Sequence, residues 1–433
     1  MTPPPAPDEQ VQASQDYLFG LALHGVKLGL DNIRFLLGRA GHPERAYPTV
    51  HVAGTNGKGS VVAALDAILR AAGYRTGRFT SPHLVSLQER FLISGAPVSE
   101  GALVEHIGFF RRAAAELDHS PTFFEMNTAI AFRHFAISDI DLALVEVGMG
   151  GRLDSTNVIL PEAAAITNID LEHTAYLGES LAEIAGEKAG IIKPGIPLVL
   201  GEIHPEAMAV ILQRAADVQA PVQRAGHDFS YRLAGPPWQE RLDYAGPRVR
   251  LEQVPLRLAG AHQGANAAVA VAIAETLLDR FPRLTTEAIQ TGLAEMRWPC
   301  RLERVLESPP VIIDVAHNVA GVRQIVRTLD RCVLVIGVAA DKDAARMIAL
   351  FAPHAEKMIC TQFSGTRALP AENLARAAGQ CPHSVTSNLR EAIALGMESA
   401  SHDCPLLITG SIYTAGEARR LLIEEHGAPP LTF

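Results

Sequence analysis

Short apolar runs along the chain alternate with longer segments in which apolar residues recur every three or four positions. The runs at residues 48–53, 142–147 and 163–167 are typical of buried β-strands. Residues 60–72 show instead the apolar spacing of one helix face, and Gly73 follows where glycine commonly ends a helix. This alternation predicts an α/β protein with a mostly parallel sheet that helices cover on both faces.

The pattern changes twice further along the chain. Residues 225–258 are rich in glycine, proline, arginine and aromatic residues, which predicts short antiparallel strands or a surface excursion. A helical pattern returns at residues 261–278, and the sequence MRWPCR at 296–301 then breaks the periodicity. The α/β rhythm restarts afterwards, which predicts a second, smaller doubly wound domain. Its expected strands are residues 311–315, 332–338, 357–361 and 405–409, and its expected helices are residues 319–329, 344–351, 371–378, 389–399 and 415–425.

These changes divide the chain into three expected parts. We predict a disordered N-terminal tail at residues 1–12, a central domain at 13–296 and a C-terminal domain at 297–433. The tail begins MTPPPAPDEQ, which is Pro-rich and acidic and lacks the basic start and apolar core of a signal peptide. Residues 10–37 look helical with an interruption around 25–29.

The composition is that of an ordinary globular protein. The chain has 433 residues, of which 48% are hydrophobic, and a net charge of −9. That charge makes nucleic acid a poor candidate for the main partner, and no stretch is long and apolar enough to cross a membrane. The five cysteines form no CxxC pair, which predicts reduced thiols rather than zinc ligation, in a cytoplasmic protein that we expect to be monomeric.

The segment HVAGTNGKGS at residues 51–60 combines glycine, lysine and serine between a predicted strand and a predicted helix. A glycine-rich turn lets backbone N–H groups point at phosphate oxygens, and the helix N-terminus favours negative charge. Lys58 can reach the outer phosphates, and Ser60 can bind Mg²⁺ or a phosphate oxygen. The spacing differs from the common Walker pattern, and the alternative is a purely structural turn. We favour a phosphate loop that includes Gly54, Thr55, Asn56, Gly57, Lys58, Gly59 and Ser60.

Candidate metal ligands follow two predicted strands. Glu146 lies at the end of an apolar strand, and His173 lies just past the end of the next one, with Asp170 before it. In an open α/β sheet that edge is where ligands bind, and a carboxylate beside a phosphate loop is a natural Mg²⁺ ligand. The glycines at 148, 150 and 151 are weak evidence by themselves, because a tight structural turn explains them equally well.

The second predicted domain carries its own strand-end cluster. Asp314, His317 and Asn318 follow its first strand, and Arg301 lies at the expected boundary. Arg301 is placed to clamp phosphates across a cleft, although an interdomain salt bridge is an equal alternative. The cluster would equally well form an Asx turn that caps the next helix. By its chemistry alone, Lys188 is more simply interpreted as a surface charge.

Several motifs together resemble the folylpolyglutamate synthase family, including the bifunctional dihydrofolate synthases. The motifs are HVAGTNGKGS (51–60), SPHL (81–84), EVGMGGRLDSTN (146–157), the Asp170/His173 pair, GEKAGIIKPG (186–195) and DVAHN (314–318). They span nearly the whole chain in consistent order. The first motif alone resembles the wider Mur-ligase-like superfamily. The chain departs from the usual family pattern at Cys300, where glycine is common, at Val319, where proline is common, and in LGLDN at 28–32.

The resemblance implies a P-loop ATPase domain followed by a smaller Rossmann-like glutamate-ligase domain, with ATP and Mg²⁺ in the cleft. It implies catalytic roles for Lys58, Lys188, His317 and Asp314, with Lys188 carbamylated so that its carbamate acts as a carboxylate near the metal. It implies Mg²⁺ ligation by Ser60, Ser81, Glu146 and His173, and nucleotide contacts by Asn266, Arg301 and Asp314. The folate- or pteroate-binding positions that it implies are Leu30, Asp31, Ser81, Pro82, His83, Thr122, Phe123, Phe124, Glu125, Leu153, Asp154 and Ser155.

These observations predict ligation of L-glutamate to dihydropteroate or to the glutamate tail of folate through an acyl phosphate, with release of ADP and phosphate. A Mur-type cell-wall ligase would share the loop and the chemistry, but it usually carries an extra N-terminal domain. A P-loop kinase or nucleotide switch gives no role to the cluster at residues 314–318. A non-catalytic nucleotide-binding module would tolerate loss of Glu146 and His173.

Overall fold

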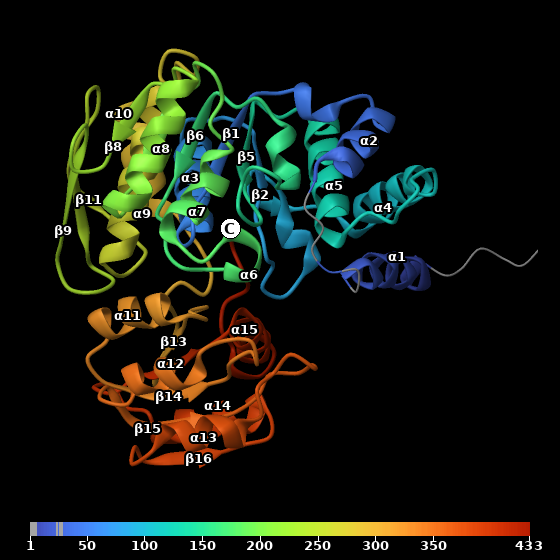
Figure 1. The fold of residues 1–433 in the computed structure, drawn as a ribbon. Coiled ribbons are helices and arrows are strands. Elements are labelled where there is room, and N and C mark those ends of the chain that lie inside the picture. Colours follow the sequence, from blue (N-terminus) through green and yellow to red (C-terminus); the bar gives the residue numbers. More distant parts are fainter. Residues whose placement is uncertain (1–6, 23–24, 26–28) are drawn as a thin grey trace, which may run out of the picture.

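The computed structural model describes residues 7–22, 25 and 29–433, and it contains two bodies that we name from their places in Figure 1. The upper body is built on an eight-stranded sheet, the upper sheet, and the lower body on a six-stranded sheet, the lower sheet. The upper sheet consists of β1 (Thr49–Ala53), β2 (Thr76–Phe79), β3 (Phe91–Ile93), β4 (Ala96–Pro97), β5 (Leu142–Glu146), β6 (Ala163–Ile166), β7 (Leu198–Leu200) and β8 (Val222–Arg224), in the order β4-β3-β2-β5-β1-β6-β7-β8.

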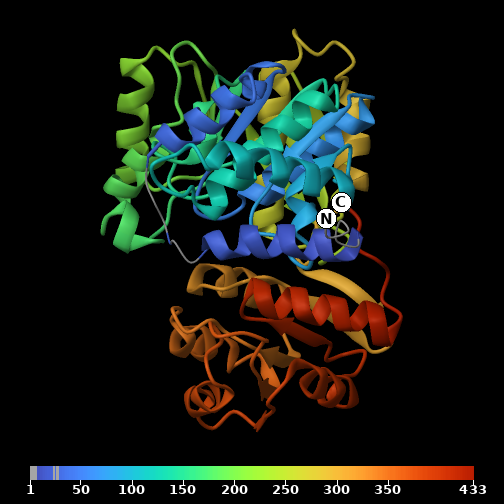
Figure 2. The ribbon, with the colours of Figure 1, turned by 90° about the vertical axis from the view of Figure 1, so that its right-hand side faces the viewer.

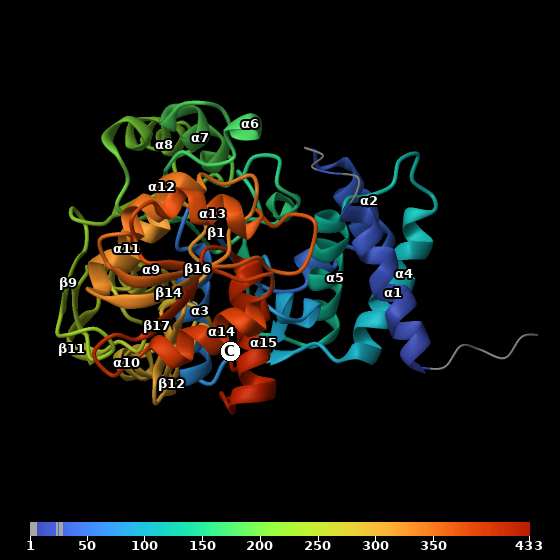
Figure 3. The same ribbon diagram turned by 90° about the horizontal axis from the view of Figure 1, so that it is seen from below.

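All neighbours in the upper sheet are parallel except the β2–β3 and β3–β4 pairs. Alternate residues of β5 pack on opposite faces, with Leu144 in one core and Val145 in the other. One face carries α3 (Lys58–Ala71), α9 (Ala261–Leu277) and α10 (Thr286–Glu295). The other carries α1 (Pro7–Leu21), α2 (Asp31–Arg39), α4 (Glu100–Ala114), α5 (Phe123–Ile137), α7 (Leu181–Ala189) and α8 (Pro205–Asp217). Seen from below, α1, α2, α4 and α5 gather at one side (Figure 3).

The lower sheet has the order β12-β13-β17-β14-β15-β16, and only the β12–β13 pair is antiparallel. Its strands are β12 (Glu303–Glu307), β13 (Pro310–Ile313), β14 (Cys332–Ile336), β15 (Ala355–Cys360), β16 (His383–Val385) and β17 (Leu406–Thr409). Its helices are α11 (Val319–Thr328), α12 (Ala344–Phe351), α13 (Ala371–Ala378), α14 (Leu389–Ser399) and α15 (Ile412–His426). Two separate cores fill the two faces of this sheet, so it is also buried on both sides.

Smaller elements complete the molecule. A three-stranded antiparallel sheet joins β9 (Ser230–Ala234), β10 (Arg241–Ala245) and β11 (Arg250–Pro255). The short elements are η2 (Pro43–Arg45), η3 (Leu87–Arg90), η4 (Ser155–Val158) and α6 (Thr174–Leu177). In Figure 2, α1 runs along the lower border of the upper body, where it faces the lower body. All five cysteines are free; four are buried, and Cys381 is half-buried.

The predicted α/β architecture with two sheets is confirmed. The predicted helices at 344–351, 371–378 and 389–399 match α12, α13 and α14. The predicted tail overlaps α1, which begins at Pro7, while residues 1–6 lie outside the described residues; the tail stays a prediction. The predicted strands omit several strands of five residues or fewer, namely β2, β3, β4, β7, β8, β12 and β16. The boundary expected near residue 296 stays a prediction.

Candidate active site

The phosphate loop connects β1 to α3, as predicted, and its lysine folds back over it. Lys58 Nζ donates to the carbonyl oxygens of Gly54 at 2.9 Å and Thr55 at 3.0 Å. An ammonium group has three donors, so one remains available for a ligand. The amides of residues 58–60 open α3 and therefore have no partner within the helix. Lys58 and the free amides of α3 together provide positive charge and N–H donors at one point, which suits a phosphate group.

The first part of the loop is held from the neighbouring strand rather than left open. The Thr55 N–H donates to the Asn168 carbonyl at 3.0 Å, and the Asn56 N–H donates to Asn168 Oδ1 at 2.8 Å. The Thr167 hydroxyl donates to the Asn56 carbonyl at 2.6 Å. The amides of Thr55 and Asn56, both predicted to bind ATP, are thus used to brace the loop. The phosphate-facing donors begin at Gly57.

Gly57 explains why a glycine is needed at the start of α3. Its φ of +85° is in the left-handed region, and a Cβ there would lie 2.3 Å from Asn266 Oδ1. Asn266 projects from α9 and donates through Nδ2 to Gln263 Oε1 at 3.1 Å. The predicted nucleotide contact Asn266 therefore lies directly against the phosphate loop.

Glu146 ends β5 beside β1, at the carboxyl edge of the upper sheet. Its side chain is buried, and Oε2 accepts a hydrogen bond from the Ser81 N–H at 3.0 Å. Burial raises the pKa of this carboxyl, whereas the nearby charges of Lys58, Arg301 and Arg90 and the Ser81 N–H act to lower it. The predicted partners Ser81 and Glu146 are thus in contact, and a cation at this place would keep the carboxylate ionised.

Lys188 is not the surface charge that its chemistry alone suggested. The residue is only 3% exposed, and Nζ donates to the Gly54 carbonyl at 2.9 Å. Burial, followed by repulsion from Lys58, lowers the pKa of Lys188 to about 7. Two lysines thus meet at one carbonyl of the phosphate loop, and one of them gives up its proton near neutral pH.

The segment after β6 faces residues of the lower sheet. His173 opens α6 with a φ of +49°, and burial lowers its pKa, so the imidazole is neutral and able to bind a metal. The charge of Lys342 acts to lower the pKa of both His173 and His317, and the charge of Glu172 acts to raise it. The carboxyl ends of the two sheets therefore face one another, as the prediction of a cleft requires.

The lower edge is organised by Asp314, just after β13. This buried carboxylate accepts hydrogen bonds from the N–H groups of Leu302 at 2.9 Å and Ala316 at 2.7 Å. Burial raises its pKa, and the charge of Arg301 opposes that effect. Asn318 accepts from the Gly321 N–H at 2.8 Å and caps α11, which confirms the capping alternative for Asn318.

Arg301 and His317 have mostly local contacts. The Arg301 guanidinium donates to the Cys300 carbonyl at 3.3 Å and lies 5.6 Å from the Trp298 ring centre. The positive charge of Arg301 acts to lower the pKa of both Glu146 and Asp314, so the guanidinium lies between the two sheets. His317 Nδ1 is 3.1 Å from the Val315 carbonyl, which can only accept; Nδ1 therefore carries the proton and Nε2 is free to accept one.

Aromatic side chains gather beside Ser81. They include the predicted substrate residues His83 and Phe123, together with Phe19, which was not predicted. Phe19 of α1 is 43% exposed and stacks on Phe123 with ring centres 5.8 Å apart. His83 meets Phe19 edge-on at 6.4 Å, and the Arg90 guanidinium covers Phe123 at 5.2 Å. Arg90 Nε also donates to His83 Nδ1 at 2.9 Å. Phe19, Phe123 and His83 thus form an aromatic cluster, the aromatic wall, next to the predicted metal site.

The other predicted substrate positions lie around the start of α5. Thr122 and Glu125 form a capping box, and Asn32 of α2 approaches Glu125 at 3.4 Å, which brings Leu30 and Asp31 to the same place. Phe124 packs so closely on Gly148 that a Cβ there would lie 2.4 Å from the ring. The structure therefore brings the segments 30–31, 122–125 and 148 together.

The third predicted substrate segment, residues 153–155, forms a tight turn that leads into η4. The buried Asp154 carboxylate accepts hydrogen bonds from the N–H groups of Met149 at 2.9 Å and Thr156 at 3.0 Å. Leu153 is half-buried, and Ser155 is buried. This arrangement gives Asp154 a structural role in the glycine-rich loop, and a substrate contact stays a prediction.

A buried arginine in β2 of the upper sheet was not predicted from the sequence. Arg78 of β2 is 1% exposed, pairs with Asp66 at 3.3 Å and lies 5.0 Å from the Trp298 ring centre. Among the residues that the structure describes, its Nε and Nη2 have no hydrogen-bond partner. The Phe433 ring lies on the same guanidinium at 5.6 Å, so the chain after α15 returns to the upper body. An arginine within a short strand carries no sequence signal that distinguishes burial from exposure.

The predicted metal ligands suit Mg²⁺ in their chemistry. Ser60, Ser81 and Glu146 offer hydroxyl or carboxylate oxygens, and His173 offers a neutral imidazole. Within the described part of the chain, no three His, Cys, Asp or Glu side chains gather into a closed metal cage. A bound Mg²⁺ would therefore depend on phosphate oxygens and water for the rest of its ligands, which is typical of Mg²⁺ at nucleotide sites.

Comparison with known families agrees with this geometry. Residues 52–274 match the Mur ligase middle domain, and residues 300–412 match the Mur ligase glutamate ligase domain. The chain is therefore an ATP-dependent ligase of the Mur ligase class. More narrowly, it belongs to the family of folylpolyglutamate synthases and dihydrofolate synthases, which confirms the resemblance seen in its motifs.

Three relatives show how far the likeness extends. The chain is 36% identical over 425 residues to the dihydrofolate synthase/folylpolyglutamate synthase of Bacillus subtilis, and the match covers 95% of this chain and 99% of that protein. The Mycobacterium tuberculosis folylpolyglutamate synthase structure with ADP and AMPPCP has 35% identity, a TM-score of 0.89 and coverage of 98% and 99%. The Escherichia coli structure with DHPP and ADP has 31% identity, a TM-score of 0.87 and coverage of 96% and 98%.

Among the described residues, no helix combines the length and the apolar character needed to span a lipid bilayer.

Proposed function

We propose that this ligase joins L-glutamate to dihydropteroate, or to the glutamate tail of a tetrahydrofolate, and converts ATP to ADP and phosphate. The observation that carries the proposal is the placement of the aromatic wall beside Ser81 and Glu146, on the same sheet edge as the phosphate loop. A pterin or aminobenzoyl ring stacks well on such a surface, and its carboxylate would then extend toward the phosphates. The binding of ADP and DHPP by the Escherichia coli relative supports this arrangement.

The first step moves a phosphoryl group. A substrate carboxylate oxygen attacks the γ-phosphorus of ATP, the bond to the β-phosphate oxygen breaks, and ADP leaves an acyl phosphate behind. Lys58 and the free amides at the start of α3 stabilise the negative charge of the transferring group. Arg301 supplies a further positive charge from the lower body. These groups are arranged before the reaction begins, so little reorganisation is needed.

The second step forms the amide bond. The amine of glutamate attacks the acyl carbon, inorganic phosphate leaves, and the amine gives up a proton. His317 is suited to accept that proton, because its Nδ1–H is used by the Val315 carbonyl and its Nε2 is free. Burial lowers the pKa of His317, which keeps the imidazole neutral and able to act as a base.

We assign Mg²⁺ to Ser60, Ser81, Glu146 and His173. When bound, the ion would neutralise charge on the phosphoryl oxygens. We also propose that Lys188, at the same edge, is carbamylated. In this reaction the neutral amine adds CO₂ and loses a proton to form a carbamate. A pKa of about 7 supplies the unprotonated amine that this reaction needs. Mass spectrometry of the intact protein with and without bicarbonate tests the carbamate, which should be lost on acidification.

The enzyme is proposed to act in the cytoplasm as a monomer, with no nucleic-acid or membrane partner. Size-exclusion chromatography with light scattering tests the monomer directly. A stable dimer at micromolar concentration would contradict it.

The function is tested by product analysis. The protein is incubated with ATP, Mg²⁺, labelled L-glutamate and either dihydropteroate or tetrahydrofolate, and the amide products are identified. A labelled product from one or both acceptors supports the proposal and decides between one activity and two. Release of ADP and phosphate without any new amide bond would contradict it. A UDP-sugar-linked acceptor, offered in parallel, tests the Mur-type cell-wall alternative.

A further inference from the structure

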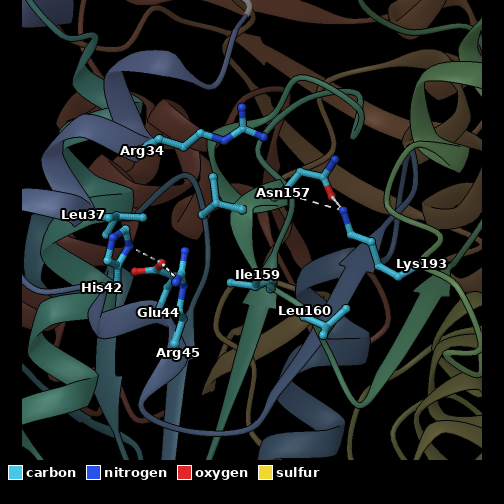
Figure 4. Close-up of a pocket in the computed structure, with 10 residues that line it drawn as sticks. Arg34, Leu37, His42, Glu44, Arg45, Asn157, Ile159, Leu160 and Lys193 are labelled. Carbon is cyan, nitrogen blue, oxygen red and sulfur yellow. Dashed lines mark hydrogen bonds and ion pairs between the residues drawn. The ribbon is translucent and has the colours of Figure 1, made fainter.

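A cavity of about 450 Å³ lies away from the phosphate loop, at the opposite edge of the upper sheet. It is enclosed by α2, by η2 and by the segment before β6, together with Lys193 before β7. Because these segments precede strands β1, β6 and β7, the cavity lies at the amino ends of those strands, whereas the candidate active site lies at their carboxyl ends. Figure 4 shows the side chains that surround it.

The lining of this cavity has an excess of positive charge. Arg34, Arg45, His42 and Lys193 are basic or titratable, and Glu44 is the acidic residue among the lining side chains. Glu44 is buried and already accepts hydrogen bonds from Arg45 Nε at 3.2 Å and His42 Nδ1 at 3.1 Å. Among the described residues, no carboxylate pairs with Arg34 or with Lys193. Two cations therefore face the cavity without a counter-charge.

Lys193 is held in place by a neutral group. Its Nζ donates to Asn157 Oδ1 at 2.7 Å, and the Asn157 amide in turn donates to the carbonyls of Arg152 at 3.0 Å and Gly190 at 3.2 Å. Burial, and then repulsion from Arg214 and Arg34, lowers the pKa of Lys193. The ammonium is thus fixed by hydrogen bonds in a place where it is electrostatically unfavourable, and a bound anion would relieve that cost.

The rest of the lining is apolar. Leu37, Val158, Ile159 and Leu160 lie among the charged groups, and Leu160 is 70% exposed. In Figure 4, Ile159 and Leu160 lie between Arg45 on one side and Lys193 on the other, with Arg34 above them. Small-molecule sites typically combine an apolar lining with a few fixed polar groups, in volumes of about 300–1,000 Å³.

We propose that this cavity binds a small organic anion, in which Arg34 and Lys193 hold a carboxylate or phosphate group and the aliphatic side chains of Leu37, Ile159 and Leu160 contact its apolar part. The planar guanidinium of Arg34 matches either oxyanion, and Lys193 adds a point charge. The site is separate from the proposed folate, glutamate and ATP positions, and it does not depend on the proposed reaction.

Isothermal titration calorimetry on the full-length protein, saturated with ADP and Mg²⁺, tests the site. Two probes separate the two oxyanion sources: phthalate, an aromatic dicarboxylate, and phenyl phosphate, an aromatic phosphate ester. We expect at least one probe to bind with one-to-one stoichiometry, and more weakly as salt is raised. The absence of saturable binding by both probes up to about 10 mM would overturn the proposal.

Variants then locate the bound probe. Arg34→Ala removes an exposed side chain that has no hydrogen-bond or ion-pair partner in the described part of the chain. The fold is therefore expected to persist, and binding should weaken about tenfold. Lys193→Ala should weaken binding at least as much. The matched control is Arg39→Ala, on the same helix but outside the cavity and paired with Glu116. Equal affinity in wild type and Arg34→Ala, or an equal loss in Arg39→Ala, would show that the probe binds elsewhere and would overturn the proposal.

Discussion

The two sheets are both mostly parallel, but their carboxyl edges differ in how the charged groups are held. At the upper edge, Lys58 and Lys188 come from different helices and both donate to the Gly54 carbonyl. At the lower edge, Asp314 accepts hydrogen bonds from backbone N–H groups, and His317 contacts the carbonyl of a residue two positions away. The upper edge is therefore built by tertiary packing, whereas the lower edge is built mostly by its own loop.

This difference suggests a division of work. The upper edge is arranged to receive ATP without help, because its donors and charges converge on one loop. The lower edge presents side chains whose free atoms, such as His317 Nε2, gain a partner when a ligand spans the two sheets. Substitutions at the two edges should then differ in both the size and the kind of their effects.

The largest effect is expected from Lys58→Ala at the upper edge. The change removes the cation closest to the transferring phosphoryl group and two hydrogen bonds that hold the loop. We expect kcat for amide formation to fall about a thousandfold. The measurement is the initial rate of labelled product formation, with Lys357→Ala in the lower body as control. A loss below about tenfold would contradict the assignment of Lys58 to catalysis.

A smaller effect is expected from Asp314→Asn at the lower edge. The substitution keeps the size of the side chain but removes the charge that faces Arg301 and replaces one acceptor oxygen by a donor. We expect kcat/KM for ATP to fall about thirtyfold, roughly 2 kcal/mol, while ADP binding measured by calorimetry changes less. An unchanged kcat/KM would mean that the lower edge does not engage the nucleotide.

Lys188 should make stability depend on pH. Because its pKa is near 7 in the folded protein and near its ordinary value of 10.5 when unfolded, the unfolded chain binds more protons between these pH values. Stability should therefore rise with pH, by about 2 kcal/mol between pH 7 and 9 for this group. Urea denaturation of the metal-free protein at the two pH values measures this rise. The neutral variant Lys188→Met should show a smaller rise, and an identical rise in both proteins would argue against a perturbed lysine.

The smallest effect is expected from Phe19→Ala, which tests whether the upper edge extends to the aromatic wall. Loss of one stacked ring is worth about 1 kcal/mol, so KM for the pteroyl substrate should rise about fivefold while KM for ATP stays the same. Phe109→Ala on α4 is the control, because Phe109 is a half-buried phenylalanine that contacts another aromatic ring, Phe110, and lies outside the aromatic wall. Equal changes in both KM values would indicate a general structural effect instead.

The sequence predicts those features of the structure that are determined by residues close together in the chain. The phosphate loop was predictable because glycine, lysine and serine act within one turn, and Asn318 was predictable as a cap for the same reason. The start of α5 also carries a local signal, since Thr122 and Glu125 match the capping-box pattern.

The remainder depends on packing between distant segments. Burial of Lys188 arises because α7 packs against the phosphate loop, and the aromatic wall requires α1 to lie on α5. Neither contact leaves a periodic pattern in the sequence. The cationic cavity is likewise assembled from residues near 34, 45 and 193, so its charge becomes visible only after folding.

The distribution of the cysteines has a practical consequence for spectroscopy. Burial raises the pKa of all five thiols. They differ in exposure: Cys300, Cys332, Cys360 and Cys404 are buried, whereas Cys381 is half-buried beside β16 in the lower body. A maleimide fluorophore should therefore attach preferentially at Cys381. Paired with an acceptor dye on an engineered cysteine in the upper body, it would report the distance between the two bodies as nucleotide is added.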